Sequence, residues 1–191
     1  MPTVTAVLQT SLGPSLRRWR ALNRVKQEVL AHELGVSQAR ISRWESGHAQ
    51  PDGRHLLKIT QLLRARPSTA ADRALLDLVS RSSDSVHLVC DLTHRLLAMS
   101  AGREKERRAP VSEYLNRPLW RFASDGIRAA EQSLAENGWY EPDGPDILYK
   151  TERVEFPEMT IPECSVRISR LPLADGSFAR LVRADRTSAM S

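Results

Sequence analysis

The sequence predicts a protein of two domains, a small all-α domain followed by an α+β domain with an antiparallel sheet. Apolar residues recur at helical spacing up to residue 63, and they alternate at strand spacing in several stretches after residue 85. Between these regions, Pro67 and Ser68 interrupt the helical pattern. The length of 191 residues suits two small domains better than one large enzyme domain, and 41% hydrophobic residues are enough for ordinary cores.

The net charge of +5 is unevenly distributed along the chain. Residues 1–66 hold 11 Lys and Arg against 4 Asp and Glu, a net charge of +7, whereas the rest holds 17 against 19, a net charge of −2. Clustered positive charge favours a polyanionic partner, although charge alone does not distinguish DNA from RNA or a membrane surface. We therefore expect the binding of a polyanion to be centred on the first domain.

Residues 27–47, QEVLAHELGVSQARISRWESG, have the pattern of two short amphipathic helices joined at a fixed turn. Their apolar positions are Val29, Leu30, Leu34, Val36, Ile41 and Trp44. Gly35 marks the break, because glycine adopts without a clash the left-handed backbone that often follows a helix end. Ser37 is placed to cap the second helix, which turns Glu45 inward with its apolar residues. This layout is typical of a helix-turn-helix motif that reads DNA.

Residues 12–63 resemble the Xre-type family of phage repressors and their bacterial relatives. The matching residues are Gln27, Ala31, Gly35, Ile41, Glu45, Gly47 and Pro51, followed by a final apolar helix with Leu56, Leu57, Ile59, Leu62 and Leu63. The sequence departs from the family at two positions, because Arg24 stands where glycine is favoured and Lys26 where Ser or Thr is favoured as an N-cap. Both departures weaken local helix signals. The resemblance implies a DNA-binding transcription regulator.

The resemblance assigns base contacts to three outer residues of the second helix, Gln38, Ala39 and Arg43. A glutamine can pair with adenine, an arginine with guanine or a phosphate, and an alanine can touch a thymine methyl group. Taken singly, an exposed Gln or Arg is usually just solvated. Within the helix-turn-helix pattern, we expect these residues to contact DNA.

Phosphate contacts are implied for a second set of residues, Gln27, Ser37 and Arg40. The exposed amides at the start of the helix after Lys26 are expected to help hold a phosphate. Positive charge at the flanks is expected from Arg17, Arg18 and Lys26. In the family, an arginine matching Arg20 pairs with a glutamate matching Glu45, and we interpret both residues as structural. Trp19 and Trp44 are expected to pack in the core rather than stack on a base.

The predicted boundary falls near residues 64–70. We divide the chain into a DNA-binding domain at 12–66, a linker helix at 67–82 and a second domain at 83–186. Ser68 or Thr69 can cap the linker helix, whose apolar stripe comprises Leu75, Leu76, Leu78 and Val79. The stripe needs a partner, either the second domain or its own copy in another subunit.

The second domain has the pattern of two strands, helices and then three strands. A hairpin is expected over 86–91 and 95–100, a solvated charged bend over 103–108, and helical structure over 111–137, ending before Gly138. Strands are expected over 150–156 and 164–173, with Cys164, Val166 and Ile168 facing inward, and Asp175-Gly176 turns the chain into a last strand, FARLVRA. This order resembles that of PAS-like sensor domains.

No cofactor, metal or catalytic motif stands out in the sequence. His87, Cys90 and His94 have a spacing that suggests a metal, but His87 and Cys90 should point to opposite faces of a strand. We therefore expect no metal, no haem and no flavin, and either a small organic ligand or none. There is no Ser-His-Asp arrangement, phosphate loop or dinucleotide fingerprint, so we do not expect an enzyme. Cys90 and Cys164 give no disulfide framework, and both are expected to be packed thiols.

The leading hypothesis is a cytoplasmic transcriptional regulator that binds a pseudo-palindromic operator in double-stranded DNA as a homodimer. Repression is favoured slightly over activation, and the second domain is expected to dimerise and to be a candidate for ligand sensing. No apolar run has the length of a membrane span, and the first residues, MPTVTAVLQTSLGP, do not form a signal peptide. The alternative is an antitoxin-like or interaction module whose second domain captures a protein partner. An enzyme with a DNA-binding appendage is a distant third.

Overall fold

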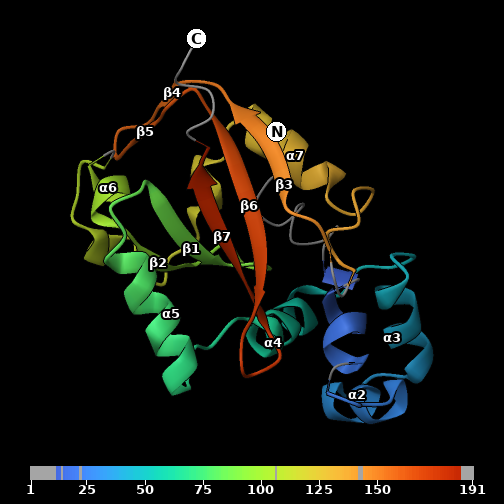
Figure 1. Cartoon of the computed structure of the whole chain (residues 1–191). Coiled ribbons are helices and arrows are strands. Elements are labelled where there is room, and N and C mark those ends of the chain that lie inside the picture. Colours follow the sequence, from blue (N-terminus) through green and yellow to red (C-terminus); the bar gives the residue numbers. More distant parts are fainter. Residues whose placement is uncertain (1–11, 14, 22, 106, 142–143, 186–191) are drawn as a thin grey trace.

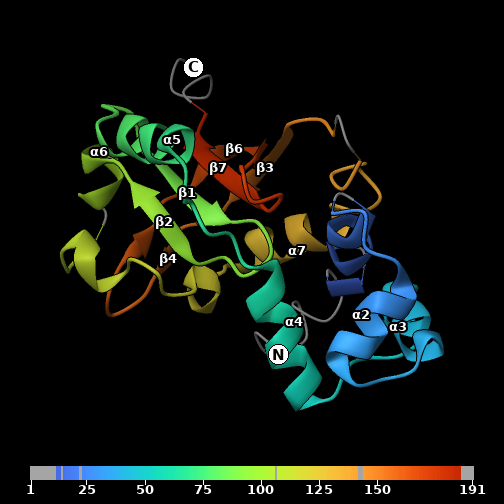
Figure 2. The ribbon, with the colours of Figure 1, turned by 90° about the horizontal axis from the view of Figure 1, so that it is seen from below.

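A computed structural model describes residues 12–13, 15–21, 23–105, 107–141 and 144–185. A helical part lies on one side of the molecule and a sheet on the other, with α2 and α3 far from β2 and α6 in both views (Figures 1 and 2). The helical part contains a first helix at residues 12–13 and 15–21, then α2 (Gln27–Leu34), α3 (Gln38–Glu45) and α4 (Gly53–Leu63). No helix within the described ranges is long and apolar enough to cross a membrane.

The turn between α2 and α3 agrees with the sequence prediction at Gly35 but not at the Ser37 hydroxyl. Gly35 ends α2 in the left-handed conformation, with φ of 69°, and the amide of Val36 donates to the Ala31 carbonyl at 2.9 Å. Ser37 stands at the N-cap of α3, but its side chain makes no capping hydrogen bond. The turn is therefore fixed by the backbone of the glycine rather than by the serine hydroxyl.

The helical part has a core that extends into the second domain. Leu16, Leu30, Ile41 and Ile59 are fully buried in it, and Trp44 packs beside them as predicted. Gly13 lets the first helix approach the end of α3, since a Cβ at Gly13 would lie 2.4 Å from the carbonyl oxygen of Trp44. Two buried residues of the sheet domain, Cys90 and Leu92, belong to this same cluster. The two parts therefore share one apolar core.

The second domain is an α+β unit around a five-stranded antiparallel sheet in the order β2-β1-β7-β6-β3. The strands are β1 (Val86–Cys90), β2 (Leu96–Met99), β3 (Ile147–Thr151), β6 (Cys164–Pro172) and β7 (Phe178–Ala184), and β4 (Val154–Glu155) pairs with β5 (Thr160–Ile161) beside them. The predicted opening hairpin is confirmed. Gly176 makes the predicted turn before β7 with φ of 80°, and Val166 and Ile168 face the core.

Both faces of the sheet are apolar, and helices cover them. One face, with Val86, Leu88 and Ala98, packs against Val79 of α5 (Ala70–Ser80). The other face carries the larger core and is covered by α7 (Asp125–Ser133) and the segments around it (Figures 1 and 2). The stripe of α5 thus finds its partner within the chain, except for Leu78, whose residue surface is 72% exposed.

A capping box fixes the start of α5. Thr69 is the N-cap, its hydroxyl accepts from the amide of Asp72, and the Asp72 carboxylate accepts from the amides of Ser68 and Thr69. The same carboxylate accepts from the amide of Ala174, in the turn between β6 and β7, at 3.2 Å. The backbone amides of Thr69 and Ser68 lower the pKa of Asp72 to about 2, so one charged group joins α5 to the sheet.

Two expectations for the second domain are corrected. The helical structure predicted over 111–137 is regular only over α7, and before it come the 3-10 turns η1 (Val111–Glu113) and η2 (Leu119–Phe122). Asn116 has a left-handed backbone with φ of 61°, and Pro118 provides no amide hydrogen, so a helix cannot continue through this stretch. The charged run at 103–108 is not simply solvated, because Arg103 in α6 (Ala101–Glu104) is buried.

The backbone at Arg24 generates a testable prediction. Arg24 has φ of 54°, a conformation that costs a residue with a Cβ roughly 1–2 kcal/mol. Arg24→Gly should therefore raise the free energy of unfolding by about 0.5–1 kcal/mol, since greater freedom in the unfolded chain offsets part of the gain. Urea unfolding followed by circular dichroism measures the change. Arg24→Ala keeps the Cβ and is the matched control, and equal stability of the two variants would contradict the explanation.

Candidate DNA-binding surface and a cavity in the second domain

A buried carboxylate holds the helix-turn-helix together. Glu45, at the end of α3, is 7% exposed and accepts two hydrogen bonds from Arg20 of the first helix, Nε to Oε1 at 2.8 Å and Nη2 to Oε2 at 3.0 Å. Arg20 also donates to the Val25 carbonyl at 3.0 Å. This two-pronged contact fixes the first helix against α3, as the family resemblance implies.

Glu45 also orients the polar residues at the surface. Gln27, at the start of α2, donates from Nε2 to Glu45 Oε2 at 2.8 Å, and its Oε1 accepts from Gln38 Nε2 at 2.6 Å. An open hollow of about 440 Å³ lies at this point, lined by Arg20, Lys26, Gln27, Glu28 and Gln38. The starts of α2 and α3 therefore present two linked amide side chains at one hollow.

The remaining residues of the predicted site are exposed on and beside α3. They are Ser37, Ala39, Arg40 and Arg43. The Arg43 side chain folds back along the helix and donates from Nε to the Ala39 carbonyl at 3.3 Å. Arg40 lies over Trp44 and places Nη2 3.5 Å from an Asp52 carboxylate oxygen. Five of the six predicted residues thus lie at or near the starts of α2 and α3, and Arg43 lies in the last turn of α3; Gln27 is half-buried and the other five are exposed.

Arg18 does not belong to this surface. Its guanidinium carbon lies 3.8 Å from the centre of the Phe178 ring, and Nη1 donates to the Tyr140 carbonyl at 2.8 Å. Arg170 stacks on the same ring at 4.0 Å. The expectation that Arg18 adds charge at the flank of the DNA site is therefore wrong, because Arg18 joins the first helix to the second domain. Arg17 and Lys26 are exposed.

Sequence reasoning missed a buried ion-pair network next to this junction. Asp91 accepts from Arg180 Nη2 at 2.8 Å, from Arg170 Nε at 2.8 Å and from Trp139 Nε1 at 3.1 Å. Arg180 also donates to Glu131 at 2.6 Å, and its side chain is 6% exposed. Burial raises the pKa of Glu131, but the charges of Arg180 and His94 and the hydrogen bonds from both side chains together outweigh this effect and hold the pKa well below its usual value. Arg180 stands between Phe178 and Val182 in the alternation of inward-facing residues along β7. This position is the one signal in the sequence that could have indicated that Arg180 is buried.

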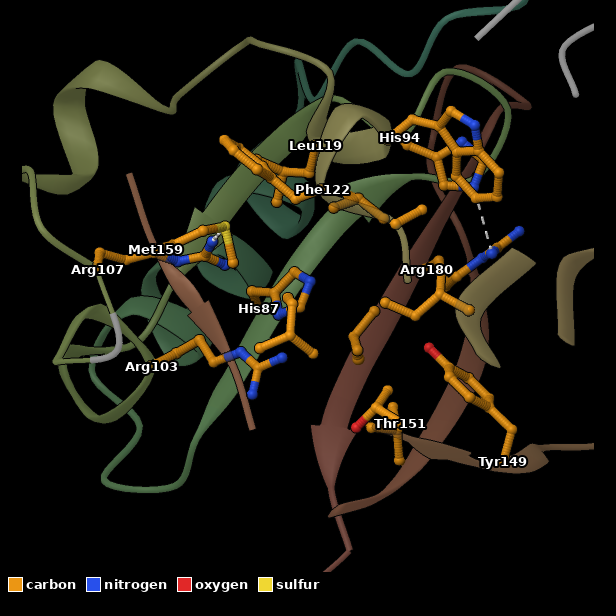
Figure 3. Close-up of a pocket in the computed structure, with 17 residues that line it drawn as sticks. His87, His94, Arg103, Arg107, Leu119, Phe122, Tyr149, Thr151, Met159 and Arg180 are labelled. Atoms are coloured by element: carbon orange, nitrogen blue, oxygen red, sulfur yellow. Dashed lines mark hydrogen bonds between the residues drawn. The ribbon is translucent and has the colours of Figure 1, made fainter. Parts of the chain in front are cut away.

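The second domain encloses a cavity of about 80 Å³ between its sheet and the segments that cover it (Figure 3). Apolar side chains from several elements line much of it, among them Val89, Phe122, Met159, Val166 and Val182. The polar side chains that line it are His87, His94, Arg103, Arg107, Trp120, Tyr149, Thr151 and Arg180. Such a mixture of apolar walls and a few polar groups is typical of small-molecule sites.

His87 is a buried polar residue of the cavity, and its surroundings define its charge state. Burial, followed by the charges of Arg103 and Arg107, lowers the pKa of His87 well below its usual value, so the ring is neutral. Within the described part of the chain, His87 Nδ1 has no hydrogen-bond partner, and the same is true of Trp120 Nε1. Burial raises the pKa of Tyr149 to about 12, so its hydroxyl keeps its proton.

The predicted divergence of His87 and Cys90 is confirmed. His87 lines the cavity, whereas Cys90 lies in the core shared with the helical part and accepts from the amide of Ala65 at 3.3 Å. Among the residues that the structure describes, no three His, Cys, Asp or Glu side chains are placed to hold a metal ion. Cys90 and Cys164 are free thiols.

Comparison with known proteins bears first on the helical part of the chain. Residues 16–68 match the helix-turn-helix family. This segment is a helix-turn-helix domain. It is similar to repressor protein C2 of Salmonella phage P22, with 32% identity over 56 residues, which are 29% of this chain. The match spans about a quarter of the repressor, 26% of its length.

Three solved structures align with this chain at low similarity. A PAS domain of an HTR-like protein from Haloarcula marismortui aligns over 60% of this chain and 90% of its own, with 17% identity and a TM-score of 0.37. An RNA-binding light-oxygen-voltage receptor aligns over 95% and 60%, with 11% identity and a TM-score of 0.42. A sensory box histidine kinase from Vibrio cholerae aligns over 61% and 94%, with 11% identity and a TM-score of 0.38. The second domain has the predicted opening pair of strands followed by helices, but five strands rather than the expected three come after them, and the strand expected over 150–156 is divided between β3 and β4.

Removal of the Glu45 carboxylate tests its structural role. Glu45→Ala leaves Arg20 and Gln27 without their shared acceptor in a buried place, and it should lower the free energy of unfolding by about 3 kcal/mol. Thermal and urea unfolding of the full chain measure the loss. Glu33→Ala, at an exposed position on α2, is the matched control and should change stability by less than about 0.5 kcal/mol. Similar effects of the two substitutions would refute a central role for Glu45.

Proposed function

We propose that the protein is a cytoplasmic transcriptional regulator that binds a pseudo-palindromic operator in double-stranded DNA as a homodimer, with repression favoured. The observation that carries the proposal is the chain of hydrogen bonds from Glu45 through Gln27 to Gln38. These bonds hold two amide side chains at the exposed start of α3. Side chains held in this way lose less freedom when they bind. The charge of +7 on residues 1–66 supplies attraction to phosphates.

In this proposal the residues of α2 and α3 and the turn between them have two kinds of contact with DNA. Gln38, Ala39 and Arg43 contact bases in the major groove, whereas Gln27, Ser37 and Arg40 contact phosphates. To bind adenine, Gln38 either gives up its hydrogen bond with Gln27 or keeps that hydrogen bond and makes the bond to adenine as well. Arg43 has to swing away from the Ala39 carbonyl, an exchange that costs little because the side chain is exposed.

The second domain is proposed to control the helix-turn-helix through the junction described above. Arg18 and Arg170 both stack on Phe178, and Cys90 and Leu92 complete the apolar core of the helical part. Arg170 is bound in turn to Asp91, which holds Arg180 at the wall of the cavity. A ligand that repositions Arg180 would thus act on a continuous set of contacts that ends at the first helix. Such a link supports a sensing role for the domain.

Dimerisation is proposed to use the exposed side of α5. Leu78 is 72% exposed there, and Leu148 on β3 is 55% exposed. A homodimer with twofold symmetry would place two α3 helices about 34 Å apart on one face of the DNA. The same exposed leucines favour the second candidate function, in which the domain captures a different protein.

Substitution of the base-facing residues tests the proposed recognition. Gln38→Ala and Arg43→Ala should each lower discrimination at one base pair by about 1–3 kcal/mol, because each removes a paired contact to a base edge. Selection of bound genomic fragments by the full chain first yields the operator, and single-base variants of that operator are then titrated with each protein. Gln132→Ala and Arg81→Ala, at exposed positions outside the helical part, serve as controls. Unchanged discrimination by the α3 variants would show that the base assignments are wrong.

A charge on α5 tests the proposed dimer. Leu78→Asp should weaken self-association at least tenfold, because it places a carboxylate in an apolar interface. Sedimentation equilibrium measures the association, and circular dichroism verifies the fold. Asp77→Leu, its exposed neighbour, is the control for a change of charge on α5. A monomeric wild-type protein that co-purifies with a stoichiometric partner would instead support the interaction module.

A further inference from the structure

The segment between α4 and α5 contains a proline and two small polar residues, as flexible linkers often do, but its backbone is held throughout. The amide of Ala65 donates to Cys90 Sγ at 3.3 Å, and the amide of Arg66 donates to an Asp175 carboxylate oxygen at 3.0 Å. Pro67 has no amide hydrogen, and the two amides that follow donate within the capping box of α5. Every amide hydrogen from Ala65 to the N-cap of α5 therefore has an acceptor.

The turn between β6 and β7 is the element of the second domain that receives this segment (Figure 1). Asp175 in this turn is oriented by Ser177, whose amide donates to the other carboxylate oxygen at 2.9 Å. In return, the amide of Ala174 donates to Asp72 at the start of α5. The linker and the turn thus bind each other in both directions, so neither can move without breaking hydrogen bonds that hold the other.

A second segment of the helical part is attached to the same turn and the strand after it. Arg18 of the first helix lies on Phe178, at the start of β7, and donates to the Tyr140 carbonyl. A Cβ at Gly176 would lie 3.5 Å from Asn23 Nδ2, so the residues after the first helix also touch the turn. One attachment would leave the helical part free to rotate about its linker, whereas attachments from two segments prevent that rotation.

The apolar core shared by the two parts opposes the remaining motions. Ala65 packs against both the core of the helical part and the apolar cluster between α5 and the sheet. Cys90 and Leu92, which complete the core of the helical part, are only 1% and 7% exposed. Domains move relative to each other by default unless their interface is large and hydrophobic. Here a hinge motion would expose buried apolar residues and break the hydrogen bonds of the linker, so several interactions oppose it together.

We propose that the helical part and the second domain form one rigid body, and that the homodimer thereby binds only operators with one distance between their half-sites. This inference rests on the proposed function, because it requires a DNA-binding dimer held by the second domain. It adds the class of DNA that such a dimer accepts. Arg18 and Asp175 are then positioning residues, which fix the place of α3 without touching DNA.

The geometry of DNA makes a rigid dimer selective for spacing. One extra base pair at the centre of an operator moves the half-sites apart by about 3.4 Å and turns one of them by about 35° relative to the other. A dimer with flexible linkers can follow such a change, because each helix-turn-helix reorients independently. A dimer of rigid bodies cannot follow it, so one of its α3 helices loses its place in the major groove.

Hydrogen exchange of the full chain without DNA tests the rigid junction directly. We expect the four amides within 65–69 to exchange at least about a hundredfold more slowly than in an unstructured peptide, because each is hydrogen-bonded. Nuclear magnetic resonance resolves the individual amides. Asp175→Ala should speed exchange at Arg66 at least about tenfold, whereas Asp146→Ala, at an exposed position outside the junction, is the matched control. Exchange of the wild-type amides at the rate of an unstructured peptide would overturn the proposal.

Operators with altered spacing test the consequence for DNA binding. The operator selected by the full chain is synthesised with one or two base pairs added to or removed from its centre, and each version is titrated with the wild-type protein. We expect each altered operator to bind at least about tenfold more weakly than the original. Equal affinity for several spacings, in a protein that binds its operator, would show that the two domains do not act as one body.

A double variant links the spacing preference to the junction. Arg18→Ala combined with Asp175→Ala removes one attachment from each of the two segments, and it should reduce the preference for the original spacing at least about threefold. Arg153→Ala combined with Asp146→Ala is the matched control, because it removes the same residue types from exposed positions outside the junction. The readout is the ratio of affinities for two spacings, so a general loss of stability does not imitate the effect. A double variant that keeps the full wild-type preference would contradict the assignment.

The two kinds of measurement separate this inference from the proposed function. Hydrogen exchange needs no DNA, so a protein with protected amides and no operator loses the regulator, and with it the spacing rule, but keeps the rigid junction. A protein that binds its operator while the amides within 65–69 exchange freely keeps the regulator and loses the inference.

Discussion

The carboxylate of Asp91 lies where three parts of the molecule meet. It accepts from Arg180, which lines the cavity, from Arg170, which stacks toward the helical part, and from Trp139, which follows α7. All of these side chains are buried, so the charges need each other, and removal of one partner from such a set typically costs about 3–5 kcal/mol. The end of β1, the last two strands and the segment after α7 are thus held at fixed positions by one acidic group.

A second buried carboxylate, that of Glu45, has the same role within the helical part. Glu45 joins the first helix to α3 through Arg20, and it also sets the direction of Gln27. In both places a carboxylate with several donors fixes distances between elements, whereas the apolar residues around it supply most of the free energy of folding. The surface of α3 and the wall of the cavity therefore both depend on acidic groups that are almost completely buried.

The helix-turn-helix could be predicted closely because its signals are local. Gly35, Ile41 and Trp44 lie within ten residues of one another and act through helix geometry alone. The left-handed backbone of Arg24 was also indicated by the sequence, because Arg24 stands where the family favours glycine. The second domain was predicted as two strands, helices and then further strands, but five strands rather than three follow the helices. The left-handed backbone at Asn116 leaves no signal in the spacing of apolar residues. The burial of Arg103 could not be predicted because Arg103 stands in a run of charged residues. Asp91 and Arg180 are 89 residues apart, so only the folded chain reveals that they pair.

The shared core has a consequence for the evolution of such chains. Cys90 and Leu92 complete the apolar interior of the helical part, and Cys90 also receives the amide of Ala65. A gene fusion that exchanged the second domain for an unrelated one would therefore open the interior of the DNA-binding part. The two halves constrain each other's sequences, and substitutions on either side of the junction have to be accepted together.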